Sequence, residues 1–411
     1  MKIAYYSVAP FVSSGFGVCT RYLAYHLAKK HEVDIFSYFG YEGVEIPFMI
    51  EDREVKIIGG NGTLVHPVFF ERYHEYDVQI LHFDGWVISK QIASLKDANI
   101  IHWCILDHDP LQRAYIPMMR SEGVKLLVPM TNWGKKILEK SKYVPKHKIT
   151  EPIPHGADPD IYFPEKNPQV DFLPDDVDFL IVAVVDNYGI RENVPEILEA
   201  FAIFLSETHT NAFLYMHTEP IKYGGYNLYE VMNAIEDKYG VDISDKVMFK
   251  VAKTYLPSEI MRRIYCKADC LINTVKGGSF EIPLIEAGLC ETPVIATDWG
   301  ATGELLGETQ ILITEKVALK ERGIGVRPSA FMWMNRTSSR QAVLNVYDIA
   351  DALWFCYNYP DKAKKTAKNM RKWVLENATW EIVGEKWLKL LDDIEENGFP
   401  EQKDIEVVSN I

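Results

Sequence analysis

Short apolar runs alternate with amphipathic segments through the N-terminal third of the chain. Residues 3–7, 31–38, 80–83, 100–106 and 125–128 form apolar runs of strand length, and residues 19–30 have the periodicity of an amphipathic helix. Such alternation is typical of a doubly wound parallel sheet. Because ligands of these sheets bind outside the carboxyl ends of the strands, the residues that follow each run are the first candidates for function.

The alternation returns in the second half after an interruption at 163–178, where proline and acidic residues predict a linker. Strands are expected at 179–185, 212–216, 247–251, 270–273 and 294–296, and helices at 194–206, 228–238, 258–267 and 380–396. The pattern predicts an α/β protein with two Rossmann-like domains, residues 1–165 and 166–376, followed by a C-terminal helical segment, 377–411.

Composition narrows the class of protein. A length of 411 residues favours two domains. The net charge of −14 disfavours nucleic-acid binding and broad adhesion to an anionic membrane. The six cysteines form no C-x-x-C pair, so we expect no zinc site. Scattered cysteines of this kind are typical of a protein in a reducing compartment. No apolar run reaches the ~18–20 residues of a membrane helix, and the apolar start is interpreted as a strand and not a signal peptide. We therefore expect a cytoplasmic protein.

The segment GGSFEIPLIEAGLCETPVIATDWGATG, residues 277–303, is the most informative part of the sequence. It predicts a glycine turn, a helix that begins near Pro283, a short buried strand from Pro293 and a second glycine turn. Glu286 is expected on the first turn of this helix. A carboxylate there could hold a ribose while the helix end holds phosphate; the alternative is an ordinary solvated glutamate.

This segment resembles the retaining glycosyltransferases of family 4, the glycogen synthase and mannosyltransferase-like group of GT-B fold. Residues that match the family motif are Phe280, Pro283, Glu286, Ala287, Pro293, Val294, Ile295 and Ala296. Two positions depart from it: Gly278 stands where the family has its first glutamate, and Glu281 where it has its second glycine. Other blocks in the same order extend the resemblance over nearly the whole chain.

The resemblance implies two doubly wound domains facing a cleft, with the acceptor on the first domain, the nucleotide sugar on the second and the C-terminal helix crossing back to the first. It implies transfer of a hexose from a nucleoside-diphosphate sugar to a hydroxyl of a glycan, lipid or other acceptor. No metal or other cofactor is expected. Membrane contact would be peripheral at most, and a homo-oligomer is possible. The alternative is a degenerate protein of this fold that binds nucleotide or glycan without catalysis.

Within the motif, the resemblance assigns the ribose to Glu286 and the rest of the donor to the loop before the helix. That loop contributes Gly278, Ser279, Phe280 and Ile282. Because Gly278 lacks the family's carboxylate, Glu281 is the candidate to replace it as a catalytic group near the sugar.

The turn 184–193, VVDNYGIREN, is the first candidate for stabilising the diphosphate. Its Arg191 could pair with phosphate oxygens, although a surface arginine is the alternative. Asn193 is expected to cap the following helix together with Glu196. The family's two cationic positions in this turn read Asp186 and Glu192, which removes positive charge where phosphate is expected.

Four further residues complete the predicted site. Gly15 and Gly17 precede the first helix and could approach the donor, although glycine turns are common. His108 matches a family histidine near the transferred sugar and could act as a catalytic group; the alternative is a loop histidine bonded to Asp107 or Asp109. Those two carboxylates also spell D-x-D, a metal-binding pattern that the resemblance disfavours. His217 ends a strand of the second domain where nucleotide is expected.

Overall fold

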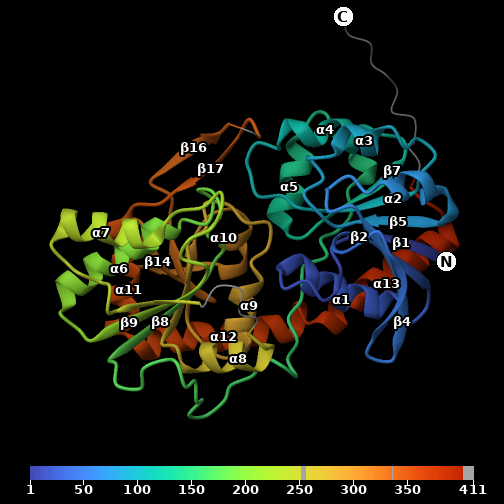
Figure 1. The fold of residues 1–411 in the computed structure, drawn as a ribbon. Helices are drawn as coiled ribbons and strands as arrows, with labels where there is room; N and C mark the ends of the chain where they lie inside the picture. Colours follow the sequence, from blue (N-terminus) through green and yellow to red (C-terminus); the bar gives the residue numbers. More distant parts are fainter. Residues whose placement is uncertain (251–255, 336, 401–411) are drawn as a thin grey trace, which may run out of the picture. The chain divides into compact units, whose positions relative to one another are not determined.

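The computed structural model describes residues 1–250, 256–335 and 337–400. The chain divides into two compact units, each with its own sheet and core (Figure 1). The first unit comprises Met1–Pro154 together with the C-terminal part of the chain from Trp380, and the second comprises His155–Thr379. Among the described residues, no helix combines the length and the apolar character that a membrane crossing requires.

The first unit is built on a seven-stranded sheet of order β3-β4-β2-β1-β5-β6-β7, parallel throughout except where β3 runs antiparallel to β4. The strands are β1 (Lys2–Ser7), β2 (Glu32–Glu42), β3 (Glu45–Ile50), β4 (Arg53–Gly60), β5 (Val78–Leu81), β6 (Ile100–Cys104) and β7 (Val124–Pro129). The helices are α1 (Gly15–Leu27), α2 (Pro67–Arg72), α3 (Ser89–Ala93), α4 (Ile116–Arg120), α5 (Asn132–Lys140) and α13 (Trp380–Asn397). Short 3-10 turns lie at Tyr73–Glu75, Arg113–Tyr115 and Lys146–Lys148.

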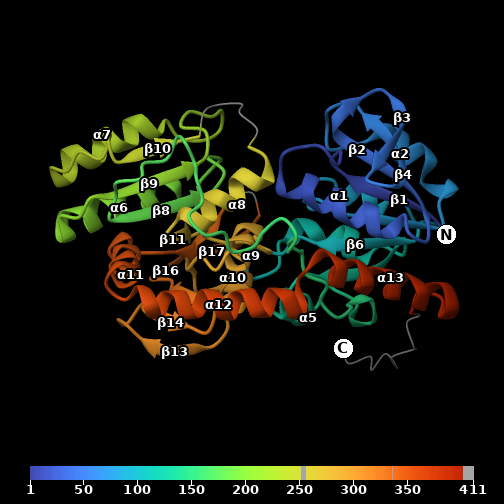
Figure 2. The same cartoon turned by 90° about the horizontal axis from the view of Figure 1, so that it is seen from below.

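The second unit is built on an eight-stranded sheet of order β10-β9-β8-β11-β12-β15-β14-β13, parallel from β10 to β15 and antiparallel beyond (Figure 2). Its strands are β8 (Phe179–Val184), β9 (Ala212–His217), β10 (Val247–Phe249), β11 (Cys270–Asn273), β12 (Val294–Thr297), β13 (Thr309–Leu312), β14 (Val317–Lys320) and β15 (Gly323–Val326). Its helices are α6 (Val194–Thr208), α7 (Leu228–Tyr239), α8 (Ser258–Lys267), α9 (Ile282–Leu289), α10 (Gly300–Leu306), α11 (Val346–Asn358) and α12 (Pro360–Asn377). A separate two-stranded sheet pairs β16 (Ala330–Met334) with β17 (Ser339–Val343).

The predicted doubly wound α/β class is confirmed, because both sheets are mainly parallel and are connected through helices. The core of each unit consists of inward-facing strand residues covered by apolar helix faces. The pattern did not reveal β3, β4 or the strands from β13 to β17, whose connections contain no intervening helix. Of the strand expected at 247–251, β10 accounts for 247–249, and Val251 lies outside the described residues.

The boundary between the units lies at residue 154 and not at 165 as expected. Residues 155–165 belong to the second unit because they pack along α8. The Arg262 guanidinium lies 4.2 Å from the centre of the Phe163 ring and pairs with Glu165 at 2.8 Å, and the Tyr162 ring lies 6.1 Å from that of Tyr265. The proline-rich composition therefore marked a loop inside the second unit and not its edge.

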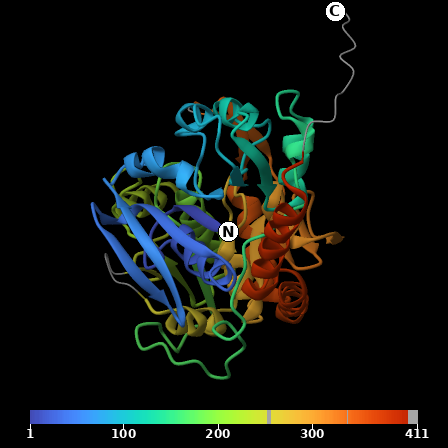
Figure 3. The same ribbon diagram turned by 90° about the vertical axis from the view of Figure 1, so that its right-hand side faces the viewer.

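The C-terminal helix α13 belongs to the first unit, where it packs along α1 (Figure 3). The rings of Tyr22 and Trp380 stack with centroids 5.0 Å apart and planes 2° apart. Gly384 allows a close approach, since a Cβ there would lie 2.2 Å from the His26 ring. Trp387 packs against Trp103 of the core at 5.3 Å. The amphipathic face read in the sequence is the face that covers the first sheet.

Candidate functional site

The carboxyl ends of β8 and β11 bring two loops of the second unit together. The loop after β8 contains Arg191, and the loop after β11 leads through Gly277 into α9. The backbone amide of Lys276 donates to the Arg191 carbonyl at 2.8 Å, and Arg191 Nη1 donates to the Gly277 carbonyl at 3.0 Å. These bonds join the two segments that the sequence had singled out separately.

Arg191 is held in place and is not a freely solvated surface arginine. Its second terminal nitrogen donates to Glu192, a carboxylate that is 7% exposed, while the Arg191 side chain itself is 40% exposed. The guanidinium is therefore anchored on one side and open to solvent on the other. Arg191 thereby neutralises the negative charge of Glu192, which stands where the motif of the resembling family has a cationic residue.

Asp186 is neutralised in the same way by a residue from another loop. Lys222, which follows β9, forms an ion pair with the Asp186 carboxylate. The two loops are further joined by Asn187, a fully buried residue whose side chain donates to the carbonyls of Glu219 and Tyr226. The acidic departures seen in the sequence thus do not leave unpaired negative charge in this loop.

Lys276 is a buried cation that sequence reasoning missed. Its ammonium group donates to Glu196 at 2.7 Å and to the side-chain oxygen of Asn193, and the residue is 4% exposed. The predicted capping box of Asn193 and Glu196 is wrong, because Asn193 makes no side-chain cap bond and both side chains bind Lys276 instead. The sequence feature that could have revealed this cation is the position of Lys276, between the buried strand β11 and the glycine pair 277–278.

Glu281 lies over Gly278. A Cβ added at Gly278 would meet the Glu281 carboxylate oxygen at 2.0 Å, so the absence of a side chain at 278 creates the space that this carboxylate occupies. Glu281 is also the N-cap residue of α9, but its side chain does not cap the helix; it accepts from Asn273 Nδ2 at 3.3 Å. Neither Gly277 nor Gly278 has a positive φ angle.

Glu286 lies one turn further into α9 than expected, because the helix begins at Ile282 and has no acidic residue in its first turn. The Tyr265 hydroxyl donates to its carboxylate at 3.0 Å. Burial raises the pKa of Glu286 from its ordinary 4.5 to about 7, against the lowering effect of hydrogen bonds from Tyr162 and Tyr265. The carboxyl group therefore titrates near neutral pH.

The other predicted donor residues of the second unit lie in the loop after β11, at the start of α9 and at the end of β9. Ser279 is half-buried, and Phe280 is buried with its ring 5.5 Å from that of His155. Ile282 is the buried first residue of α9. At the end of β9, burial and the neighbouring Lys250 lower the pKa of His217 to about 4, so its ring is neutral at physiological pH.

His108 lies in the first unit, after β6, with one ring nitrogen held. Its Nδ1 contacts the carboxylate of Asp107 and lies 2.6 Å from Gln112 Nε2. The residue is 6% exposed, and its Nε2 has no hydrogen-bond partner among the described residues. The bond to Asp107 was the alternative considered for this histidine, and Nε2 is a buried atom without a partner in the described part of the chain.

Gly15 and Gly17 lie in the first turn of α1 and not in a loop before it. Ser14 caps the helix by accepting from the Gly17 amide at 3.1 Å. A Cβ at Gly17 would lie 1.9 Å from the Val12 carbonyl oxygen, so glycine is required here for close packing of the preceding loop. The Gly17 amide is therefore already used within the turn.

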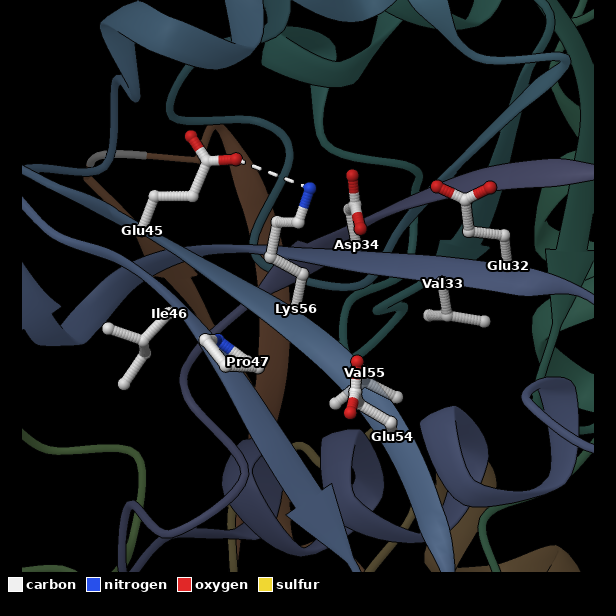
Figure 4. Close-up of a pocket in the computed structure, with 9 residues that line it drawn as sticks. All are labelled: Glu32, Val33, Asp34, Glu45, Ile46, Pro47, Glu54, Val55 and Lys56. Carbon is white, nitrogen blue, oxygen red and sulfur yellow. Dashed lines mark ion pairs between the residues drawn. The ribbon is translucent and has the colours of Figure 1, made fainter.

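A surface hollow of about 550 Å³ lies elsewhere on the first unit (Figure 4). It lies at the amino ends of the parallel strands β2 and β4, the opposite end from the carboxyl edge. Asp34 in its wall accepts from the Tyr76 hydroxyl at 2.6 Å, and Lys56 pairs with Glu45 at 3.4 Å. None of the predicted donor residues lines this hollow.

A family model of known proteins matches the part of the chain that contains the two loops described above. Residues 190–322 match the family model described as glycosyl transferases group 1. This range contains Arg191, the loop from Lys276 to Glu281 and α9. A search of curated proteins found no match.

Solved structures resemble the chain over most of its length. Sucrose-phosphate synthase from Thermosynechococcus elongatus is 17% identical with a TM-score of 0.71, over 96% of this chain and 99% of that one. HepE from Anabaena, in complex with UDP-glucose, is 14% identical with a TM-score of 0.67, over 96% and 100%. The α,α-trehalose 6-phosphate synthase from Burkholderia multivorans is 12% identical with a TM-score of 0.66, over 96% and 98%. The chain thus has the GT-B fold and is similar, through residues 190–322, to the glycosyltransferases of group 1.

Proposed function

We propose that the protein is a retaining glycosyltransferase that moves a hexose from a nucleoside-diphosphate sugar to a hydroxyl acceptor. The observation that carries the proposal is the junction of Arg191 with the Gly277–Glu281 loop, inside the segment that matches the family model. HepE, which shares the fold, was solved with UDP-glucose, and this supports a nucleotide sugar as donor.

For the diphosphate, we assign Arg191 and backbone amides of the neighbouring loops. The solvent-facing side of the anchored guanidinium can pair with phosphate oxygens and stabilise the charge that develops on the leaving group. Anchoring by Glu192 and the Gly277 carbonyl limits the motion of the side chain before the donor arrives. We expect no metal: transfer should persist in EDTA, and loss of activity that Mn²⁺ restores would contradict this assignment.

For the sugar, we assign Glu281 as the substitute for the carboxylate missing at Gly278. Its oxygens lie where a side chain from position 278 would begin, and a carboxylate can accept from sugar hydroxyls. The ribose is assigned to Glu286, and Glu286→Ala should lower nucleotide affinity while the fold survives. Unchanged affinity in that variant would remove Glu286 from the site.

For the transfer step, we assign His108. Asp107 orients its ring by accepting from Nδ1, and Gln112 Nε2 donates to the same carboxylate, so Nε2 is the ring atom that we assign to a sugar hydroxyl. A histidine held in this way can also move a proton without reorienting. Gly15, in the first turn of α1, and neutral His217 are assigned supporting contacts to the donor.

Nucleotide-sugar turnover tests the proposal. The full chain should show a raised melting temperature with one of UDP-, GDP- or ADP-glucose or the corresponding mannose donors, and should release the nucleoside diphosphate on incubation with acceptors. Anomeric configuration in the product, measured by NMR, tests retention. The protein is the hexosyltransferase proposed here if turnover is found; it is not if no donor is consumed.

A second candidate function is binding without catalysis. It is favoured by the pairing of Arg191 with Glu192, which uses part of the guanidinium's charge before any phosphate binds. A melting shift with nucleotide sugars but no turnover, in wild type and in Gly278→Glu alike, would support this alternative. Turnover in Gly278→Glu alone would identify a degenerate transferase.

A further inference from the structure

The hairpin of β16 and β17 exposes a row of aromatic side chains. It forms its own two-stranded sheet and projects from the second unit beside α10 (Figure 1). Phe331 is 46% exposed and Trp333 is 66% exposed. Alternation along the strand puts both rings on one outward face.

Arg340 on β17 lies between the two rings. It stands opposite Trp333 in the strand register, and its guanidinium carbon lies 5.6 Å from the centre of each ring. Positions two apart on a strand are separated by about 6.8 Å along it. The result is a narrow platform of ring, guanidinium and ring, defined here as the hairpin platform: Phe331, Trp333 and Arg340.

The hairpin platform is continuous with the carboxyl edge of the second sheet. Phe331 packs against Trp299 with ring centroids 5.5 Å apart. Trp299 is the N-cap residue of α10, two residues after β12 ends at Thr297. At its base, the hairpin bonds to the donor loop, since the Ala342 amide donates to the Lys276 carbonyl at 2.8 Å. The platform therefore begins at the edge to which the donor is assigned.

The size of the platform favours a small occupant. A large aromatic side chain can bury roughly 150–250 Å², so the exposed fractions of Phe331 and Trp333 together offer on the order of 250 Å². A stable interface between two copies of a chain uses about 800 Å² per partner. The two exposed rings by themselves thus offer only about a third of the area that one side of a stable dimer interface uses.

The chemistry of the platform fits a carbohydrate. A hexose presents apolar C–H groups on the faces of its ring and hydroxyl groups around its rim, so aromatic faces can cover the former while guanidinium N–H groups donate to the latter. We infer that the hairpin platform binds a glycan acceptor and aligns it toward the donor edge of the second unit. This inference rests on the proposed function and identifies the acceptor class as a carbohydrate chain.

Affinity electrophoresis of the full chain tests the inference. Native gels containing amylose, dextran, yeast mannan or glycol chitin serve as probes, with UDP in the gel. At least one polysaccharide should retard the wild type. Trp333→Ala should weaken retardation about tenfold in apparent Kd, because a stacked ring is lost, and Trp333→Tyr should retain most of it. Trp354→Ala, an equally simple truncation of a 40% exposed tryptophan on α11, should behave as wild type.

The outcomes are distinguishable from failure of the proposed function. The melting shift with nucleotide sugar should be the same in Trp333→Ala as in wild type, since the platform does not hold the donor. If neither protein shows this melting shift, the proposed transferase function is rejected, but the glycan-binding surface is not. Retardation by none of the four polysaccharides, or equal retardation of Trp333→Ala, overturns the inference. So does a Trp333-dependent dimer in sedimentation velocity, or Trp333-dependent flotation with phosphatidylglycerol vesicles.

Discussion

Two turns lead from a strand into a helix, one in each unit, and they use their residues differently. In the first unit, Ser14 caps α1, because its hydroxyl oxygen accepts a hydrogen bond from the Gly17 amide at 3.1 Å. In the second unit, Glu281 occupies the same cap position of α9 but makes no cap bond, and its carboxylate lies over Gly278. The first turn satisfies its own polar groups, which stabilises it. The second holds its carboxylate through Asn273 Nδ2 and places it beside the loop that contains Arg191.

The comparison also explains why glycine occurs in both turns. Gly17 faces the Val12 backbone carbonyl, which cannot move without shifting the loop, whereas Gly278 faces the end of a flexible side chain. A glycine in a strand-to-helix turn is therefore weak evidence for a phosphate site by itself. What the glycine is close to decides whether it serves packing or function.

The largest loss of turnover is expected for His108→Ala. This variant tests whether the first unit contributes to the transfer step and not to donor binding. Turnover should fall about a hundredfold or more, the usual loss of a positioned acid–base or hydrogen-bonding group, while nucleotide affinity stays unchanged. Steady-state kinetics and a nucleotide titration measure the two quantities. His74→Ala, at an exposed histidine of the same unit, is the control, and equal loss of turnover and nucleotide affinity in His108→Ala would contradict the assignment.

A smaller loss is expected for Glu281→Ala. A buried sugar hydroxyl that loses its partner costs about 1–3 kcal/mol, which corresponds to roughly ten- to a hundredfold in turnover. The affinity for free nucleoside diphosphate should hardly change, because the carboxylate is assigned to the sugar. The exposed Glu308 supplies the matched control, Glu308→Ala. Wild-type kinetics in Glu281→Ala would show that the carboxylate only fills the space above Gly278.

Alanine at the two glycines should separate packing from function directly. Gly17→Ala should lower the free energy of unfolding by about 1–3 kcal/mol, because the methyl group meets backbone, as measured by denaturant unfolding. Gly278→Ala should leave stability nearly unchanged but lower turnover by displacing Glu281. In that case Gly278→Ala combined with Glu281→Ala should be no worse than Glu281→Ala alone. Additive losses in the double variant would assign Gly278 a role independent of Glu281.

The smallest effect concerns pH and Glu286. Its pKa is raised in the folded protein, from 4.5 to about 7, so between these pH values the folded state binds more protons than the unfolded state. Stability should therefore fall as pH rises through this window. Glu286→Gln removes this titration, so its melting temperature relative to wild type should rise between pH 5 and pH 8. A constant difference across that range would show that Glu286 has an ordinary pKa.

Local patterns in the sequence determined much of the architecture. The apolar runs predicted β8, β9, β11 and β12 to within about two residues, since buried parallel strands must be continuously apolar. The helix begins at Ile282 with Pro283 next to it, as a proline tolerated only in the first turn dictates. The GT-B fold followed from these elements and from the resemblance carried by Phe280, Pro283 and the segment from Pro293.

Only the tertiary structure decided which charges meet. Lys276 and Asn193 are separated by 82 intervening residues, yet Lys276 replaces the expected helix cap, because an ammonium buried at the sheet edge needs oxygen partners. Asp186 likewise finds Lys222 on a different loop. Periodicity predicts which residues face inward, but pairing between loops depends on the order of strands in the sheet, and no local pattern contains that order. The sequence alone determined the helix-connected strands of both sheets and the composition of the loops assigned to the donor, and the packing of β8, β9 and β11 determined the neighbours of those loops.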